Sequence, residues 1–457
     1  MKSKVFLVLF IFFLVLQSQG QTISFDQFIE QVKTHHPIIK QADFELELGD
    51  ANLLFARGSF DPELVSSIRE KYFSEDRYYS ELNAAIQIPT WFGIEFESGY
   101  DRNIGNFVTP NGSTSNNGLL YAGVSVPLGK GLFVDKRRNE LAKAKIYKES
   151  TLAQQNEQKN QLVFDAAQSY WRWFEAWNSM KIYEDAVQIS EQRFKAIVSS
   201  VALGDRSPID TVEAKIQLQN RQIQLQLERV NVENARLFLA GFLWLDGMVP
   251  LELTNDAIPI SVNEVSRTPL DNDMLESQNS LLENHPTIRR QSLAIESLGQ
   301  ELKYKKEQLK PKLDVKYRPL SSAGSEFSAQ NYSWGVDLAI PLFLRSARGQ
   351  IALTSIKIKQ SDLKLTNKRV QLKIKLSQAF NKWELSNNQY VQQNSVVNNY
   401  QVLVQGERQL FEGGESSLFL VNQREQAYFK SRIKLNSLLV KNQLSAVEAK
   451  FIGGLRD

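Results

Sequence analysis

The sequence contains no cysteine. Structural disulfides, thiolate metal sites, a cysteine nucleophile and a bacterial lipoprotein anchor are therefore excluded. Only three histidines are present, His35, His36 and His285, and two of them stand directly before a proline. We interpret these histidines as structural residues rather than as metal ligands, and we expect no metal ion and no other cofactor.

An excess of charge of one sign is also lacking. The formal net charge is +3, and no stretch rich in lysine and arginine is interleaved with aromatic residues, so no nucleic acid or other polyanion is indicated as a partner. The acidic pairs Asp26/Glu30 and Glu45/Glu47 lie among charged neighbours, which is typical of solvated helix faces. No nucleophile–base set and no phosphate-binding loop accompanies them, so we expect a protein that is not an enzyme.

Only one long hydrophobic run is present, at the N-terminus. Lys2 and Lys4 precede the apolar residues 5–16, and small residues at the −3 and −1 positions end at Gly20. This pattern predicts a secretory signal peptide over residues 1–20. A membrane anchor is the alternative, but the run is shorter than the roughly 18–20 residues that a span needs. Without a second run, the mature chain could enter a membrane only as a β-barrel, whose alternating strands are not evident in hydropathy.

What the sequence does contain is an internal repeat. His36-Pro37 is followed after 25 residues by Pro62, and His285-Pro286 is followed after 25 residues by Pro311. Alternating segments then end in similar tripeptides, Val126-Pro127-Leu128 and Ile340-Pro341-Leu342. Each copy predicts a helix, strands, a long helix, a glycine turn and a second long helix. We therefore expect two copies that form one pseudo-symmetric body.

The pattern divides the chain after the signal peptide into a first repeat over residues 21–248, a linker over 249–280 and a second repeat over 281–457. In the first repeat we predict strands at about 64–73, 78–89, 92–102 and 118–128, and long helices at about 139–202 and 207–245. In the second repeat we predict a helix at about 287–310, strands at about 312–318 and 331–342, and long helices at about 347–411 and 416–450.

The predicted strands alternate between apolar and polar residues. Such strands suit a transmembrane barrel with apolar side chains outward, although a soluble, half-buried sheet shows the same alternation. Aromatic residues gather near the strand ends and would form an interfacial girdle. The girdle candidates are Trp91, Phe92, Tyr100, Tyr332 and Trp334.

The helix predicted at about 207–245 has two apolar rows, each with a spacing of seven residues. One row is Ile209, Ile216, Ile223, Val230 and Leu237, and the other is Leu218, Leu225, Val232 and Leu239. The rows are offset by two residues, or about 200° around the axis, so the helix needs a neighbour on each side. The alternative is a globular helix with one stripe. In the last repeat, the Gln- and Asn-rich stretch 378–409 keeps a helical stripe, which favours a solvated helix over a disordered tract.

Glycine turns are predicted between the long helices of each repeat. Gly204 and Gly414 suit the left-handed conformation that ends a helix. Ser207 is the expected N-cap of the next helix, Pro208 its first residue and Asp210 the acid of a capping box.

In this order, the motifs resemble the TolC-like outer-membrane factor (outer membrane efflux protein) family of bacterial efflux and type I secretion systems. The resemblance spans about residues 22–453 and is carried by motifs of the first repeat and by the counterparts that several of them have in the second. These are His36-Pro37, Ala56-Arg57, Pro62, Val126-Pro127-Leu128, Arg138, Gly204-x-x-Ser207-x-x-Asp210, His285-Pro286, Pro311, Ile340-Pro341-Leu342-Phe343, Arg348 and Gly414-x-x-Ser417.

The resemblance implies an α+β fold shared across a homotrimer. Long antiparallel coiled-coil helices would form a periplasmic α-barrel, and the strands would form a transmembrane β-barrel in outer-membrane lipid. The implied location is the outer membrane of a Gram-negative cell, with extension into the periplasm. The implied partners are a periplasmic adaptor (membrane fusion protein) and an inner-membrane pump.

The sequence departs from the family pattern in two places. The acids that commonly line the aperture on the second-repeat tip helix correspond to Leu420 and Gln423, and the longer strand region of the first repeat puts the usual strand number in doubt. We therefore expect the aperture chemistry at the two glycine turns and the adjacent helix ends. The candidate residues are Gly204, Asp205, Arg206, Ser207, Asp210, Glu213, Glu412, Gly414, Glu415 and Ser417.

Two classes of function remain open from the sequence. The first is an outer-membrane exit duct that passes small molecules or polypeptides from a pump and its adaptor. The alternative is a soluble, exported coiled-coil scaffold or adhesin without transport activity. Only the duct gives the alternating strands a use.

Overall fold

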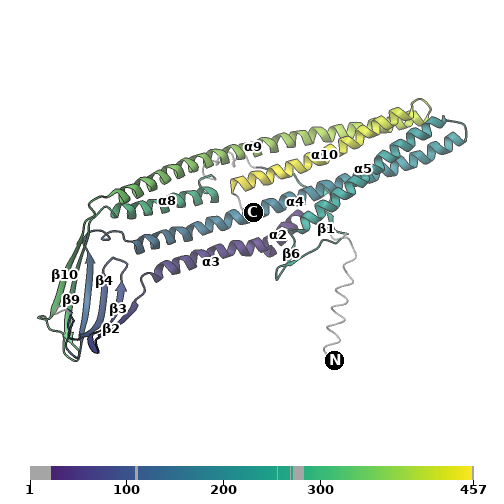
Figure 1. The fold of residues 1–457 in the computed structure, drawn as a ribbon. Coiled ribbons are helices and arrows are strands. Elements are labelled where there is room, and N and C mark those ends of the chain that lie inside the picture. Colours follow the sequence, from purple (N-terminus) through teal and green to yellow (C-terminus); the bar gives the residue numbers. More distant parts are fainter. Residues whose placement is uncertain (1–21, 109–111, 255, 268, 271–281, 455–457) are drawn as a thin grey trace, which may run out of the picture. The chain divides into compact units, whose positions relative to one another are not determined.

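The computed structural model describes residues 22–108, 112–254, 256–267, 269–270 and 282–454 (Figure 1). The predicted signal peptide and part of the predicted linker lie outside these residues. Among the described helices, none has both the length and the apolar character needed to cross a membrane.

The elements follow the predicted order in both repeats. The first repeat has β1 (Thr22–Ile23), α2 (Phe25–His35), α3 (Pro37–Gly58), β2 (Glu63–Phe73), β3 (Asp76–Pro89), β4 (Glu95–Ile104), β5 (Leu119–Pro127), α4 (Lys136–Ala202) and α5 (Pro208–Ala240). Short elements follow, β6 (Trp244–Leu245), β7 (Val249–Pro250), β8 (Ile258–Pro259) and η1 (Val262–Glu264). The second repeat has α8 (Pro286–Glu307), β9 (Lys312–Ser322), β10 (Tyr332–Ala339), α9 (Arg345–Glu412) and α10 (Leu418–Gly453).

The chain forms two compact units, and each unit draws on both repeats. We call Met1–Asp43, Asn156–Pro286 and Arg369–Asp457 the helical unit, and Phe44–Gln155 with Thr287–Lys368 the sheet unit. The compact units therefore do not coincide with the repeats, because the long helices α4 and α9 contribute one part to each unit.

The sheet unit contains a six-stranded antiparallel sheet in the order β10-β9-β5-β4-β3-β2. Four strands come from the first repeat and two from the second, as the alternation predicts. The strand predicted at about 92–102 corresponds to β4, which begins three residues later than predicted, at Glu95. Residues 90–94 form a turn instead, in which the Thr90 N–H donates to the Ile94 carbonyl at 3.1 Å.

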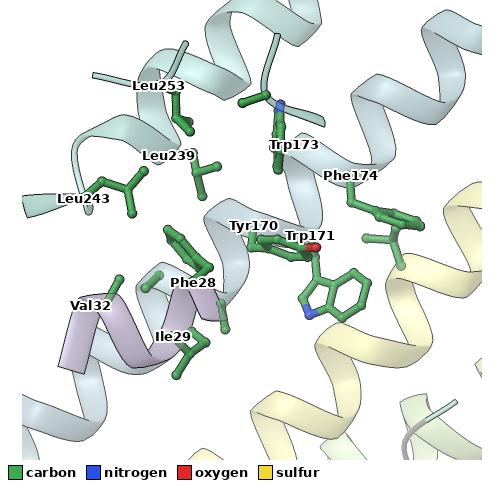
Figure 2. Packing of buried hydrophobic residues seen from close by; sticks show 14 of the residues in the cluster. Phe28, Ile29, Val32, Tyr170, Trp171, Trp173, Phe174, Leu239, Leu243 and Leu253 are labelled. Carbon is green, nitrogen blue, oxygen red and sulfur yellow. The ribbon is translucent and has the colours of Figure 1, made fainter. Parts of the chain in front are cut away.

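The core of the helical unit is rich in aromatic side chains from α4. Tyr170, Trp173 and Phe174 are almost fully buried, and they pack with residues of α2 and with Leu239 of α5 (Figure 2). The Tyr170 hydroxyl donates to the Ile23 carbonyl at 2.8 Å, so the core also holds the strand β1. Burial of such large rings is the main source of stabilisation here.

The predicted linker belongs partly to this core, which the sequence did not indicate. Leu253 and Ala257 are buried in it, and Ile258–Pro259 pairs in parallel with Thr22–Ile23. The preceding helix α5 ends at Ala240, about five residues earlier than predicted. Residues 241–243 turn the chain back, and Trp244–Leu245 then pairs with Val249–Pro250.

The long predicted helices are continuous. Helix α9 runs without a break through the Gln- and Asn-rich stretch, so the prediction of a helix there is confirmed. Within it, Gln393 is buried and its side-chain amide donates to the Ser431 carbonyl of α10 at 3.1 Å.

Candidate functional site

Both helical hairpins reverse through the same backbone turn. Gly204 and Gly414 have positive φ angles of 83° and 78°, a conformation that glycine adopts without steric cost. The N–H of the following residue donates to a carbonyl five residues earlier, Asp205 to Ser200 at 3.0 Å and Glu415 to Leu410 at 2.8 Å. These are Schellman-type helix ends. The predicted glycine roles at the two turns are confirmed.

The N-caps after the turns differ from the expectation at Ser207. Ser207 is the N-cap of α5 and Pro208 its first residue, but the Ser207 side chain makes no capping hydrogen bond. The predicted capping box with Asp210 is therefore wrong; only the backbone N–H of Asp210 donates to the Ser207 carbonyl, at 3.0 Å. Ser417 does cap α10, because its hydroxyl accepts from the Leu420 N–H at 3.4 Å.

Acidic side chains are left without ion pairs at the two turns. Asp205, Glu412 and Glu415 are exposed and Asp210 is half-buried, and none of them has an ion-pair partner among the described residues. Arg206 does not neutralise them within the protomer. Its guanidinium lies over the Phe411 ring at 3.8 Å and donates to the Phe411 carbonyl at 3.1 Å. Arg206 thus joins the first turn to the C-terminal end of α9.

The start of α10 is apolar where the resemblance placed acids. Leu418 and Val421 are buried against Ile197 and Ala214, whereas Leu420 and Gln423 are exposed. The exposed positions therefore carry no charge.

The first acid of α10 lies two residues beyond Gln423, at Glu425, and it was not among the predicted site residues. Its side chain is fully buried and accepts hydrogen bonds from three guanidinium groups. Arg193 of α4 donates to both carboxylate oxygens, in one case at 2.6 Å. Arg221 of α5 donates at 3.0 Å, and Arg408 of α9 donates at 2.6 and 2.9 Å. One carboxylate therefore joins four helices. We call Glu425 and its partners Arg193, Arg221 and Arg408 the Glu425 cluster.

The guanidinium groups keep Glu425 ionised despite its burial. Desolvation raises the pKa of its carboxyl, but the hydrogen bond and charge of Arg193, with the charges of Arg221 and Arg408, lower this pKa overall to about 2. Burial lowers the pKa of Arg221, and Glu425 acts in the opposite direction. The Arg221 guanidinium also lies over the Phe429 ring at 5.1 Å and donates to the Ser190 hydroxyl.

Polar contacts extend the cluster toward the turns. The Asn422 side-chain amide donates to Glu213 of α5 at 2.9 Å, and its oxygen accepts from Arg193 at 3.4 Å. Glu213, predicted as an aperture acid, is therefore engaged within the protomer. Closer to the second turn, Glu407 accepts from the Ser416 hydroxyl and lies 3.6 Å from Arg424.

A sequence signal for Glu425 does exist. It stands four residues after Val421 and four before Phe429, both buried, so it occupies an apolar stripe of α10. An acid in such a stripe requires a buried cation. The partners are up to 232 residues away, so spacing alone does not identify them.

The two apolar rows of α5 have different environments. Leu225, Val232 and Leu239 are buried within the protomer. The opposite row remains exposed to between 49% and 67%, and consists of Ile209, Ile216, Ile223, Val230 and Leu237. Helix α9 also has an exposed apolar row with a spacing of seven residues, which consists of Val396, Leu403 and Leu410.

The sheet has one apolar and one charged face. Cross-strand register places Ile88, Phe96, Val124, Tyr317 and Trp334 in one row. The ion pairs on the other face include Arg318–Glu97, Lys316–Asp337 at 2.9 Å and Lys312–Asp314 at 3.2 Å. Among the described residues no strand borders the outer edge of β2 or β10. The sheet is thus two-faced and open at both edges.

The predicted girdle residues lie at several levels of the sheet. Trp334 is 69% exposed in the row just described, and Tyr332, two residues earlier on the same face of β10, is also exposed. Trp91 and Phe92 are exposed in the turn between β3 and β4, with ring centroids 5.8 Å apart. Tyr100 is half-buried, and its hydroxyl donates to the Asn117 carbonyl at 3.0 Å.

Comparison with known proteins connects these features to one family. The family model of outer membrane efflux proteins matches residues 278–449. Among curated proteins, no sequence matches the chain.

Solved structures match over nearly the whole length, covering 94% of this chain in each case. The Campylobacter jejuni CmeC outer membrane channel has a TM-score of 0.67 and 12% identity, with 85% of that chain covered. The Vibrio cholerae outer membrane protein VceC has a TM-score of 0.68 and 14% identity, with 96% covered. The open state of the Neisseria gonorrhoeae MtrE outer membrane channel has a TM-score of 0.68 and 11% identity, with 89% covered.

At such identities, the structural matches establish the fold, and the sequence match to the family model is confined to the second half of the chain. The matched region contains β9, β10, α9 and most of α10, including Glu425. The chain is thus similar to outer membrane efflux proteins in sequence over residues 278–449, and it shares the fold of the solved outer membrane channels.

Proposed function

We propose that three copies of this chain form the outer-membrane exit duct of a tripartite efflux or type I secretion system. The duct passes small molecules or polypeptides from an inner-membrane pump and its periplasmic adaptor across the periplasm and the outer membrane. The observation that carries the proposal is the six-stranded sheet, whose apolar face is exposed and whose two edges are paired by no strand among the described residues.

Closure of the sheet by identical copies follows from its topology. An edge in lipid is not tolerated, because its backbone groups would lack hydrogen-bond partners. Neighbouring strands alternate in direction and their number is even, so β2 and β10 run in opposite directions. The β2 edge of one copy therefore fits the β10 edge of the next as an antiparallel pair, and three copies give an eighteen-stranded barrel.

The exposed rows on α5 and α9 support the same assembly. A row of aliphatic residues at seven-residue spacing is the surface with which a helix packs against another in a coiled coil. Within the protomer, the α5 row from Ile209 to Leu237 has no such cover. In the trimer this row would pack against helices of the adjacent copy. The same assembly would then close the sheets into one ring and the helices into another.

The turns form the periplasmic mouth in this proposal. Threefold symmetry would bring Asp205, Glu412 and Glu415 of each copy to one rim, with Arg206 held on Phe411. Repeated carboxylates favour cations at a constriction. The Arg206 guanidinium lies partly buried over the Phe411 ring, and such a cation–π contact contributes about 0.5–2 kcal/mol, which suits a mouth that an adaptor opens.

The test is fractionation of cells that make the chain, followed by chemical cross-linking in mild detergent. We expect the protein in outer membranes and a cross-linked mass of three chains. Val336→Glu should abolish insertion because it places a charge on the apolar face. Ser333→Glu, on the charged face opposite Arg318, is the matched control and should insert normally. A soluble periplasmic monomer would instead indicate a scaffold or adhesin.

A further inference from the structure

The Glu425 cluster buries more charge than the other described ion pair near the turns, Glu407 with Arg424. Its carboxylate is fully buried, and Arg193 and Arg221 are buried to about nine-tenths. Charge-assisted hydrogen bonds to a carboxylate are stronger than neutral ones, and loss of one partner leaves buried charges uncompensated. The cluster therefore resists separation of the helices it joins.

The polar contacts beyond the cluster hold less buried charge, although an apolar cluster packs the four helix ends there. Its buried members are Ile197, Ala214, Phe411, Leu418 and Val421. The turn between α4 and α5 contacts α9 through Arg206, whose guanidinium lies over the Phe411 ring and donates to the Phe411 carbonyl. Helices α5 and α10 meet through a neutral amide and a carboxylate, at Asn422 and Glu213. We therefore expect the helix ends beyond the cluster to separate more readily than the helices that meet at the buried carboxylate and its three guanidinium groups.

We propose that the Glu425 cluster is the fixed point of the mouth. It holds α4, α5, α9 and α10 together as one bundle, and it confines opening to the segments beyond it, residues 194–220 and 409–424. Glu425 is thus a positioning residue for the gate. The opening movement rests on the proposed duct function, whereas the rigidity of the bundle does not.

Rigidity is measured by hydrogen exchange with mass spectrometry on the purified full chain. Amides of 194–220 and 409–424 should exchange faster than those of the same four helices on the other side of the cluster. Glu425→Gln should speed exchange across the cluster by about a hundredfold or more, as expected for loss of a buried charge partner. Equal protection on both sides in the unmodified chain would overturn the proposal.

Movement is measured with paired cysteines, for which the cysteine-free chain is well suited. Ser179 and Asn436 are in hydrogen-bond contact at 3.2 Å between α4 and α10, on the far side of the cluster from the turns. Glu213 and Asn422 are in contact at 2.9 Å on the near side. Each pair is replaced by cysteines and bridged with a short reducible bis-thiosulfonate reagent, and single-channel conductance is recorded before and after reduction.

The bridge at positions 213 and 422 should abolish large-conductance openings, and reduction should restore them. The bridge at positions 179 and 436 should leave openings unchanged. If the 179–436 bridge also blocks opening, or the 213–422 bridge has no effect, the movement is not confined beyond the cluster. If the unmodified chain forms no channel at all, the duct function fails, and the exchange pattern still decides whether the cluster is rigid. These experiments keep Glu425 in place, so they do not depend on the folding of Glu425→Gln.

Discussion

Replacement of Glu425 by glutamine should destabilise the chain by about 3 kcal/mol. The three guanidinium groups lower the pKa of this carboxyl from an ordinary value of 4.5 to about 2. Because one pH unit corresponds to about 1.4 kcal/mol, ionised Glu425 favours the folded state by roughly 3 kcal/mol. Removing one partner of a buried ion pair costs a similar amount, about 3–5 kcal/mol. Glutamine has nearly the same shape, so the loss comes from charge rather than from packing.

The pH dependence of this stabilisation has a definite sign. The pKa of Glu425 is lower in the folded chain than in the unfolded chain, so its contribution is complete above about pH 4.5 and is lost as the pH falls toward 2. Unmodified protein should therefore lose stability across this window more steeply than Glu425→Gln. At pH 7 the difference between the two proteins should be largest.

The assay is denaturant unfolding in detergent, followed by the far-ultraviolet circular dichroism of the helices. The matched control is Glu448→Gln on the same helix, where the Glu448 carboxylate pairs at 3.1 Å with Lys382 on an exposed surface. That exposed pair should contribute no more than about 1 kcal/mol. Arg221→Gln should be less destabilising in the Glu425→Gln background than alone, because it then removes a repelling charge. Equal effects of the Glu425 and Glu448 substitutions would refute the reasoning.

Three further outcomes follow from the exposed surfaces. Ile223→Asp should dissociate the proposed trimer in mild detergent by placing charges in the exposed row of α5. Gln222→Asp, an exposed position about 100° around the helix from Ile223, should leave the cross-linked mass unchanged. Glu412→Gln combined with Glu415→Gln should lower the preference for cations in bilayer recordings by about two- to tenfold, and an unchanged reversal potential would place the selective acids elsewhere. Arg206→Ala should raise the frequency of openings, because it frees the first turn from α9; unchanged conductance records would show that this contact does not restrain the mouth.

The fold could be predicted largely because its signals are local and occur twice. Alternation of apolar and polar residues over eight to fourteen positions predicts β2 to β5, β9 and β10. The Gly-x-x-Ser pattern predicts both turns. Element ends were less predictable. The start of β4 depends on the turn at Thr90, and the end of α5 depends on pairing of Trp244 with Pro250.

The candidate site could be predicted only in part, for a physical reason. Exposed acids at Glu412 and Glu415 follow from their position in the turn. The Glu425 cluster instead depends on which helix faces meet, and its members are separated by as many as 232 residues. An acid within the apolar stripe of α10 predicts a buried cation, but it does not say which arginine supplies it.

Glu425 is not a displaced aperture acid, and helix geometry shows why. Leu420 and Gln423 are three residues apart, so they lie on neighbouring faces of α10, and both are exposed. Glu425 follows Leu420 by five residues, which turns its side chain about 140° away from that of Leu420 at roughly 100° per residue. It therefore points among α4, α5 and α9, where three arginines neutralise it. The single acid in this part of α10 holds the helices together, and charge at the mouth must come from the turns themselves.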